Sequence, residues 1–333
     1  MKTNMGNIVF PHPPGAGGPG SFQSRFEDVL RNRGHALGYA KGSILPDIIF
    51  VVGGTKKLFW LLKMKLKGVP ILYRLDGINW LHKKTKVGVK KYFVTEIRNW
   101  TNKFIHAFLA DKIVYQSKFV ETWWSKSGWK ERENTSIIYN GVDIPDNIGK
   151  SGSKFDKRRL VILEGTIDYS PYAVKLINEL AHSLLQDVTI ELYGKFENKK
   201  NQQRIDERVQ YKGFLERDKV FSVLHNSVYL SLDINPACPN TVIEAMASGA
   251  PVAAFDTGAL PELVKNGAGE IVPYGSDPWK LGYPNVKELV NKIEDIFSNY
   301  QTYSGNAKNL ATDKFSLEKM FESYMAEIKS LTK

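Results

Sequence analysis

The stretch VYLSLDINPACPNTVIEAMASGAPVAAFD, residues 228–256, decides the fold. It opens with the apolar run VYLSLD and closes with PVAAFD, and both runs have the composition of buried β-strands. Between them a proline-containing loop leads into the helical run TVIEAMAS, which begins at Pro239 or Asn240 and ends at Gly249. A strand, a helix and a second strand in succession predict a βαβ unit with parallel strands.

The same alternation of apolar runs and helical patterns extends over the whole chain. The runs are continuous rather than alternating, as in parallel strands that helices cover on both faces. The sequence therefore predicts an α/β protein with two doubly wound parallel-sheet domains. The predicted strands are 7–10, 46–52, 70–76, 111–117, 136–142, 159–166, 188–194, 209–214, 228–233, 251–256 and 270–274. The predicted helices include 21–33, 55–67, 87–108, 118–126, 285–298 and 315–331.

A length of 333 residues also suits two domains. Residues 143–159 lack an apolar period, so we expect a linker there and domains at 1–147 and 148–312, with a C-terminal helix at 313–333. A single cysteine excludes internal disulfides and fits a reducing compartment. The start has no long apolar region, and no run of residues is apolar enough to span a bilayer, so we expect a cytoplasmic protein.

The basic charge of the chain is concentrated in its first half. The net charge is +11, and residues 54–130 alone contain 17 lysines and arginines against four carboxylates. Six of the seven tryptophans lie in or beside that stretch. A one-sided basic field predicts an anionic partner, which is phosphate, nucleic acid or an anionic membrane surface, whereas a merely solubilising surface is the alternative.

The helix predicted at 55–67 favours the membrane among these partners. Leu58, Leu61, Leu62 and Leu66 share one face, and lysines with Trp60 lie opposite, as in helices that rest on anionic headgroups. A sheet-covering helix with a solvated face explains the same pattern equally well. Nucleic acid is less favoured, because the helix lacks arginines for base readout. We therefore expect the basic stretch 55–130 to place the protein at the inner face of the cell membrane.

Two loops of the first half carry candidate functional residues. Gly15, Gly17 and Gly20 match G-x-G-x-x-G, but the loop is long and proline-rich, and no acidic residue follows in the place that a dinucleotide ribose requires. An anion-binding glycine loop and a flexible turn remain as interpretations. The strand YRLDG places Arg74 and Asp76 at its carboxyl end, where Asp76 can orient or deprotonate a hydroxyl or form a structural pair with Arg74.

The second half carries the candidate donor-binding residues. In LEGTIDYSP (163–171), Gly165 lets the backbone approach a ligand and Thr166 offers a hydroxyl, and ELYGKF (191–196) repeats this arrangement with Lys195 just past Gly194. The amides of Asn240, Thr241 and Val242 open a helix and form a site for an anion. Glu244 follows one turn later and can accept hydrogen bonds from two sugar hydroxyls. The sequence has no D-x-D motif and no metal-ligand spacing, so we expect no metal, and Cys238 is interpreted as a small apolar residue.

These residues resemble those of the retaining GT-B glycosyltransferases of glycosyltransferase family 4. The match is strongest in CPNTVIEAMASGAPVAAFDTGALPELV (238–264), which is similar to the family's E-x7-E nucleotide-sugar signature. Weaker matches occur in family order at 17–22, 110–117, 138–143, 191–196 and 209–215.

The resemblance implies two Rossmann-like domains that face a cleft, with no metal requirement. It places Glu244 on the nucleotide ribose, the backbone of residues 240–242 near the pyrophosphate, and Gly17 and Gly18 near the donor phosphates. Asp76 would act on the acceptor hydroxyl. A lipid-linked or surface glycan is the expected acceptor. A glycosyltransferase that modifies a nucleic-acid base and a non-catalytic sugar-nucleotide-binding module are the alternatives.

Two positions depart from the family pattern. The first glutamate of E-x7-E falls at Pro236, and the family's basic pair after the first strand of the second domain falls on Thr166 and near Pro171. Lys195, helix dipoles and the glycine loop are therefore expected to neutralise the donor phosphates. The chain is interpreted as a divergent branch of the family.

Overall fold

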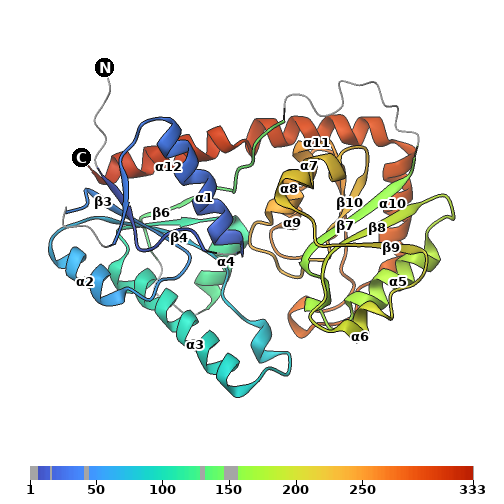
Figure 1. Cartoon of the computed structure of the whole chain (residues 1–333), viewed down its shortest axis with the longest axis horizontal. Coiled ribbons are helices and arrows are strands. Elements are labelled where there is room, and N and C mark those ends of the chain that lie inside the picture. The colour runs from blue at the N-terminus through green and yellow to red at the C-terminus, as the bar shows by residue number, and fades with distance from the viewer. Residues whose placement is uncertain (1–6, 16, 41–44, 128–131, 146–156, 333) are drawn as a thin grey trace. The chain divides into compact units, whose positions relative to one another are not determined.

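The computed structural model describes residues 7–15, 17–40, 45–127, 132–145 and 157–332. The chain forms two compact units, one of residues 1–140 with 317–333 and one of residues 141–316 (Figure 1). Each unit contains one parallel sheet with helices packed against it. Trp129 and most of the expected linker, residues 146–156, lie outside the described residues.

The sheet of unit 1 has six parallel strands in the order β2-β1-β3-β4-β5-β6. The sequence predicts five of them and misses β2, which is only three residues long and half-buried. The strands are β1 (Ile8–Phe10), β2 (Leu37–Tyr39), β3 (Ile48–Val52), β4 (Ile71–Leu75), β5 (Lys112–Tyr115) and β6 (Thr135–Ile137).

The core of unit 1 joins its first and last helices. Phe22 and Phe26 of α1 pack against Phe321 and Tyr324 of α12, with ring centroids 5.0 Å apart for Phe26–Phe321 and 5.1 Å apart for Phe22–Tyr324. The helices of the unit are α1 (Gly17–Asn32), α2 (Leu58–Leu66), η1 (Leu81–Lys83), α3 (Val89–Phe104), the π-helical segment η2 (Ile105–Leu109), α4 (Lys118–Lys126) and α12 (Leu317–Leu331).

Helix α2 buries a different face from the one that its sequence predicts. Leu61 and Met64 are buried, whereas Leu62 and Leu66 are exposed. The buried face of α2 therefore contains Leu61 and Met64 and differs from the predicted leucine face. Apolar residues occur all round this helix, so its sequence pattern does not determine which face is buried. The expected tryptophan-rich surface is also smaller than predicted, since Trp124 is buried and Trp60 is only half-exposed.

The sheet of unit 2 also has six parallel strands, in the order β12-β11-β10-β7-β8-β9. All six were predicted from the sequence. The strands are β7 (Arg159–Thr166), β8 (Thr189–Lys195), β9 (Val209–Gly213), β10 (Val228–Leu230), β11 (Val252–Phe255) and β12 (Gly269–Val272).

Helices α5 and α10 of unit 2 pack against one core cluster with the apolar side chains of its strands. Helix α8 packs against α7 and α11. The helices are η3 (Ile167–Tyr169), α5 (Ala173–Ser183), α6 (Lys199–Gln202), η4 (Arg217–Lys219), α7 (Val220–Leu224), α8 (Asn240–Ala247), α9 (Leu260–Leu263), η5 (Pro278–Lys280), α10 (Val286–Ser298) and α11 (Tyr300–Lys314).

Each sheet has one point at which the strand order reverses. In unit 2 the chain runs from β7 to β8 and β9 on one side, and then returns to β10, β11 and β12 on the other. In unit 1 it runs from β1 to β2 and then to β3 on the opposite side. The loops after β7 and β10, and after β1 and β3, therefore separate at the carboxyl edge, where open α/β sheets bind ligands. No helix in the described part of the chain is long and apolar enough to cross a bilayer.

Candidate functional site

A cavity of about 200 Å³ lies at the switch point of unit 2. Residues 164–167, 169 and 170, at the end of β7 and just after it, line one side with Ala173, and residues 232–234 after β10 line the other. The cavity includes Gly165 and Thr166, which were both predicted as site residues. A Cβ on Gly165 would meet nothing within 4 Å, so its backbone borders open space that a ligand can enter.

Two carboxyl groups that the sequence analysis did not single out line this cavity. Glu164 ends the buried part of β7 and accepts a hydrogen bond from the Leu232 amide at 3.1 Å. Burial raises the pKa of Glu164 well above its usual range, and the charge of Asp233 adds to the shift. Burial also raises the pKa of Asp233 to about 6. Both side chains are half-buried, and their raised pKa values mean that the pair holds a proton at a higher pH than isolated carboxyls do.

Helix α8 begins just after this cavity, on the loop that leaves β10. Asn240 is the first helical residue and Pro239 is the N-cap, whereas the sequence placed Pro239 at the first helical position or Asn240 at the cap. Pro239, as the N-cap, supplies no side-chain hydrogen bond to the start of the helix. The amides of Asn240, Thr241 and Val242 occupy the first three helical positions, whose N–H groups have no intrahelical acceptor in an α-helix. Gly249, with φ +75°, follows the helix in the left-handed conformation that ends it.

Glu244 lies in the second turn of α8 and is buried, with 8% of its surface exposed. Its Oε1 is 3.8 Å from Nη2 of Arg217, which lies on η4 and is more than half exposed. The sequence analysis missed Arg217, because 27 residues separate it from Glu244 and only the fold brings them together. The site thus contains a guanidinium near the carboxylate that was predicted to bind a ribose.

Lys195 is the last residue of β8 and pairs with Thr166 of β7, the strand whose end lines the cavity. Its Nζ lies 4.3 Å from the centroid of the exposed Phe214 ring. Gly194 precedes it with φ +138°, and a Cβ there would come within 2.3 Å of the Glu164 carbonyl oxygen. Glycine is therefore required where β8 passes β7, and it places Lys195 and Phe214 together at the carboxyl edge.

The glycine loop of unit 1 follows β1 and opens α1. Gly17 is the first helical residue with φ +79°, and neither Gly17 nor Gly18 would bring a Cβ within 4 Å of another atom. Gly20 differs, because a Cβ there would overlap the carbonyl oxygen of Gly15 at 1.8 Å. The loop thus folds closely on itself at Gly20 and leaves open space at Gly17 and Gly18.

Asp76 and Arg74 lie together after β4 in unit 1. Arg74 is 1% exposed and donates from Nη1 to Asp76 Oδ1 at 2.9 Å and from Nη2 to Asn140 Oδ1 at 2.7 Å. Gln116 donates to the same Asp76 oxygen, and the Trp124 indole donates to the Asp76 carbonyl at 2.9 Å. These donors fix Oδ1, and Asp76 retains 24% side-chain exposure. Gln116, Asn140 and Trp124 were not predicted to lie near Asp76, since they come from other parts of the unit: Gln116 follows β5, Asn140 follows β6, and Trp124 lies in α4.

Comparison with known proteins connects unit 2 with one enzyme family. Residues 159–299 match the family model of glycosyl transferases group 1. An uncharacterized glycosyltransferase of Haemophilus influenzae is 22% identical over 231 residues, which are 67% of this chain and 62% of that protein. The match thus spans less than two thirds of the length of this relative.

Solved structures resemble the whole chain in fold. HepE of Anabaena, in complex with UDP-glucose, has a TM-score of 0.69 at 17% identity and matches 98% of this chain and 100% of its own. Sucrose-phosphate synthase of Thermosynechococcus elongatus has a TM-score of 0.67 at 18% identity over 98% of each chain. WaaG, a glycosyltransferase involved in lipopolysaccharide biosynthesis, has a TM-score of 0.66 at 13% identity over 97% of this chain and 99% of its own.

The chain has the GT-B fold, and its residues 159–299 match the group 1 glycosyltransferase family. The predicted pair of Rossmann-like parallel-sheet domains is confirmed, and the group 1 domain contains the switch-point cavity, helix α8 and Glu244. Pro236 is half-buried in the loop before α8, and its carbonyl accepts a hydrogen bond from the Ala259 amide at 2.9 Å. Gly258, with φ +58°, packs so closely on Pro236 that a Cβ there would lie 2.4 Å from it. Pro236 therefore shapes the loop and supplies no carboxylate.

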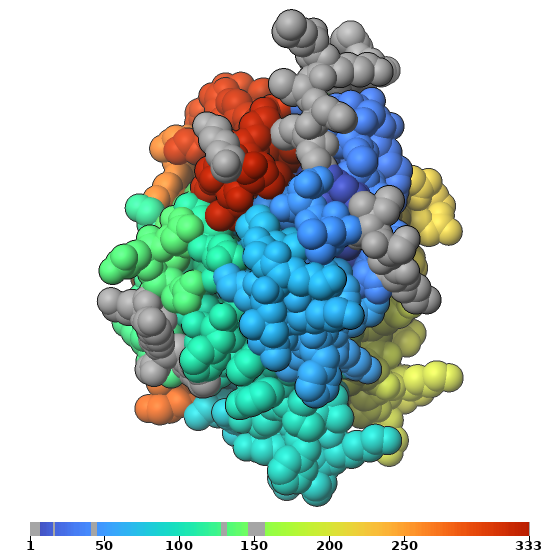
Figure 2. Space-filling model, turned by 90° about the vertical axis from the view of Figure 1, so that its left-hand side faces the viewer, coloured from blue at the N-terminus to red at the C-terminus, as the bar shows by residue number. Residues whose placement is uncertain are grey.

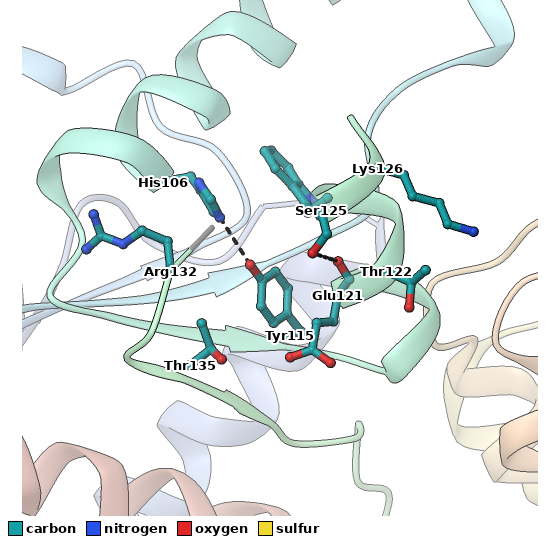
Figure 3. A pocket seen from close by; sticks show the side chains of 9 residues that line it. His106, Tyr115, Glu121, Thr122, Ser125, Lys126, Arg132 and Thr135 are labelled. Carbon is teal, nitrogen blue, oxygen red and sulfur yellow. Dashed lines mark hydrogen bonds between the residues drawn. The ribbon is translucent and has the colours of Figure 1, made fainter. Parts of the chain in front are cut away.

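A second cavity, of about 340 Å³, lies in unit 1 (Figure 3). Tyr115 of β5 shares a hydrogen bond of 3.1 Å with Nε2 of His106, and the Trp124 ring stacks on His106 at 5.1 Å. Burial and the charge of Arg132 lower the pKa of His106 to about 4, so its ring is neutral at pH 7, and burial raises the pKa of Tyr115 to about 12. No predicted site residue lines this cavity, which lies two strands from the switch point of unit 1.

Proposed function

We propose that this protein transfers a sugar from a nucleoside diphosphate sugar to an acceptor hydroxyl, with retention at the anomeric carbon and without a metal ion. The observation that carries the proposal is the arrangement at the switch point of unit 2. A cavity, the start of helix α8 and a buried glutamate on that helix lie at the two loops where such sheets bind nucleotides.

The donor chemistry assigns a part to each of these features. The amides of Asn240, Thr241 and Val242 hold the diphosphate, and Glu244 accepts hydrogen bonds from the two ribose hydroxyls. Arg217 supplies positive charge near the ribose, and Lys195 adds charge at the end of β8. HepE is solved with UDP-glucose and with UDP, which makes uridine nucleotides the first donors to test.

The reaction breaks the bond between the anomeric carbon and the diphosphate oxygen, and that oxygen keeps the electron pair. The acceptor oxygen forms the new bond to the anomeric carbon on the same face, and its proton passes to the departing diphosphate. Backbone amides and cations stabilise the charge that develops on the leaving group. Asp76 orients the acceptor hydroxyl through Oδ2, since Arg74 and Gln116 already occupy Oδ1.

A lipid-linked or surface glycan is the proposed acceptor. WaaG acts in lipopolysaccharide biosynthesis, which supports an acceptor of this class for a protein of the same fold. The described residues contain no group of three or more His, Cys, Asp or Glu side chains that could hold a metal ion.

The test is donor turnover over a panel of UDP, GDP, ADP and CMP sugars, with and without glycolipid acceptors from bacterial membranes. We expect release of the nucleoside phosphate from one donor class, faster with acceptor and unchanged by EDTA. Turnover that requires a divalent ion would contradict the mechanism. Inversion at the anomeric carbon, read by NMR of the product, would contradict retention.

One observation favours a second function, that of a donor-binding module without catalysis. Thr166 stands where the family resemblance expects a basic residue, and the carboxyl pair Glu164–Asp233 lies in the same cavity. Phosphate charge is therefore weakly compensated there. Donor binding by calorimetry, without turnover on any acceptor, would establish this function instead.

A further inference from the structure

Unit 1 presents an apolar surface that no described part of the chain covers. Ten of the fourteen exposed large hydrophobic side chains in the described ranges fall within residues 59–108. Three lie on α2, six on α3 and one on η2. Figure 2 shows α2 and α3 next to each other on one face, and both helices contact η2. We call these exposed parts of α2, η2 and α3 the α2–α3 surface.

Helix α3 exposes its apolar face, whereas an ordinary surface helix buries that face. Val89, Phe93, Ile97, Trp100 and Phe104 recur at helical spacing, and the first four are each more than half exposed. The one buried residue of α3 is Asn99, a polar side chain.

Polar contacts attach the helix to its own unit. Asn99 exchanges hydrogen bonds of 2.9–3.0 Å with Asn79. Glu96 contacts His82 at 2.7 Å and Lys83 at 3.2 Å. A helix in a protein gains most of its stability by burying its apolar stripe. The exposed stripe of α3 therefore predicts a partner that no described part of the chain supplies.

The charge around the stripe identifies the class of partner. Residues 56–103 contain 13 lysines and arginines and only two carboxylates. Eight of the lysines are exposed: Lys56, Lys63, Lys67, Lys83, Lys84, Lys86, Lys90 and Lys91. An apolar stripe with a lysine rim matches an anionic bilayer, in which acyl chains take the stripe and headgroups take the ammonium groups.

We infer that the α2–α3 surface docks on an anionic lipid bilayer, with α3 lying in the headgroup region and its apolar stripe inserted. A second copy of this chain fits less well, since it would bring an equally basic surface to the contact. Nucleic acid fits less well too, because it offers no apolar partner for Phe93, Ile97 and Trp100. The inference stands on unit 1 alone and is independent of the donor site in unit 2.

Vesicle flotation of the whole protein tests the inference, with phosphatidylcholine vesicles that contain or lack phosphatidylglycerol. We expect binding only to the anionic vesicles. Ile97→Ser lowers the partition coefficient roughly fivefold to tenfold, because one large apolar side chain no longer inserts. The matched control is Leu185→Ser, which removes an equally exposed residue in unit 2 and leaves binding unchanged. Lys83→Gln/Lys84→Gln/Lys86→Gln lowers anionic-lipid binding roughly 100-fold.

A second readout reports insertion itself. Brominated acyl chains quench the Trp100 indole, so quenching is greater in the wild-type protein than in Trp100→Phe. Equal effects of Ile97→Ser and Leu185→Ser, or equal quenching in both proteins, would overturn the inference. So would self-association that Ile97→Ser abolishes, or binding to duplex DNA in place of vesicles. Donor affinity in solution stays the same in all these variants, so a failure here is distinct from a failure of the donor site.

Discussion

Arg217 and Glu244 approach to 3.8 Å between Nη2 and Oε1, although one lies on η4 and the other inside α8. The guanidinium of Arg217 therefore lies beside Glu244, the carboxylate that we propose binds the ribose. Because Arg217 is 56% exposed, the ion pair itself adds little to the stability of the fold.

The first prediction concerns this arginine. Arg217→Ala changes the free energy of unfolding by less than about 1 kcal/mol, as expected for an exposed ion pair. It weakens binding of a UDP-sugar about tenfold and reduces the salt dependence of binding, because the diphosphate loses a nearby charge. Lys219→Ala is the matched control, since Lys219 lies on the same turn but pairs with Glu216. Equal affinity in Arg217→Ala and wild type, measured by calorimetry, would exclude a role in donor binding.

The carboxyl pair in the cavity predicts a pH dependence of donor binding. Glu164 and Asp233 both have a raised pKa, and that of Asp233 is about 6. As pH rises through 6 the pair gains negative charge next to the donor, so UDP-glucose affinity falls between pH 5 and pH 8. The phosphates of UDP-glucose do not titrate in this range. In Asp233→Asn the fall is smaller, and an unchanged profile in this variant would show that the pair does not face the donor.

The same pair predicts a stability change of defined sign. A carboxyl group whose pKa is raised on folding stabilises the native state below its unfolded pKa of about 3.9 and loses that contribution as pH rises through about 6. Asp233→Asn therefore raises the free energy of unfolding by about 2–3 kcal/mol at pH 8 and leaves it nearly unchanged at pH 4. Urea denaturation at both pH values measures this. A loss of stability at pH 8 would count against the assignment.

The hydrogen bonds around Asp76 predict that its substitution lowers the rate of transfer but leaves nucleotide affinity unchanged. Asp76→Asn keeps the size of the side chain and lowers the transfer rate about 100-fold or more, whereas UDP affinity is unchanged. The asparagine is preferable to alanine, because alanine would leave the buried Arg74 guanidinium without its carboxylate. Parallel losses of turnover and UDP affinity would show that Asp76 acts in donor binding or in folding.

A substitution at Gly53 is expected to move the carboxylate of Asp76. It has φ +64°, and a Cβ there would lie 2.8 Å from Asp76 Oδ2. Gly53→Ala therefore displaces the free oxygen of Asp76 and slows transfer. Gly68→Ala is the control, because Gly68 has φ +79° but open space around its Cβ position. Both variants lose about 1 kcal/mol of stability from the left-handed backbone, and only Gly53→Ala loses turnover.

Sequence reasoning predicted the parts that local pattern determines. The apolar runs at 159–166 and 228–256 have the length and composition of buried parallel strands, and β7, β10, β11 and α8 lie there. Strand β2 was missed because three half-buried residues carry too little apolar signal. The buried face of α2 was assigned wrongly, because leucines occupy both of its sides and only packing selects Leu61 and Met64.

The site residues that could not be predicted from the sequence are those that only the tertiary structure brings together. Asp233 is distant in sequence from Glu164, and they share a cavity only because β7 and β10 are neighbours in the sheet. Gln116 reaches Asp76 in the same way, from the end of β5 beside β4. By contrast, the start of α8 and the position of Glu244 on this helix were predicted from the sequence, because the signals that start and end a helix are local.

The most direct test of the central claim is a calorimetric cycle with UDP and 2′-deoxy-UDP on the wild-type protein and on Glu244→Ala, with Glu288→Ala of α10 as the control. If Glu244 binds the ribose hydroxyls, wild type and Glu288→Ala prefer UDP by about tenfold or more. In Glu244→Ala the preference disappears, and UDP affinity falls about 100-fold. An equal preference for UDP in wild type and in Glu244→Ala would contradict the account.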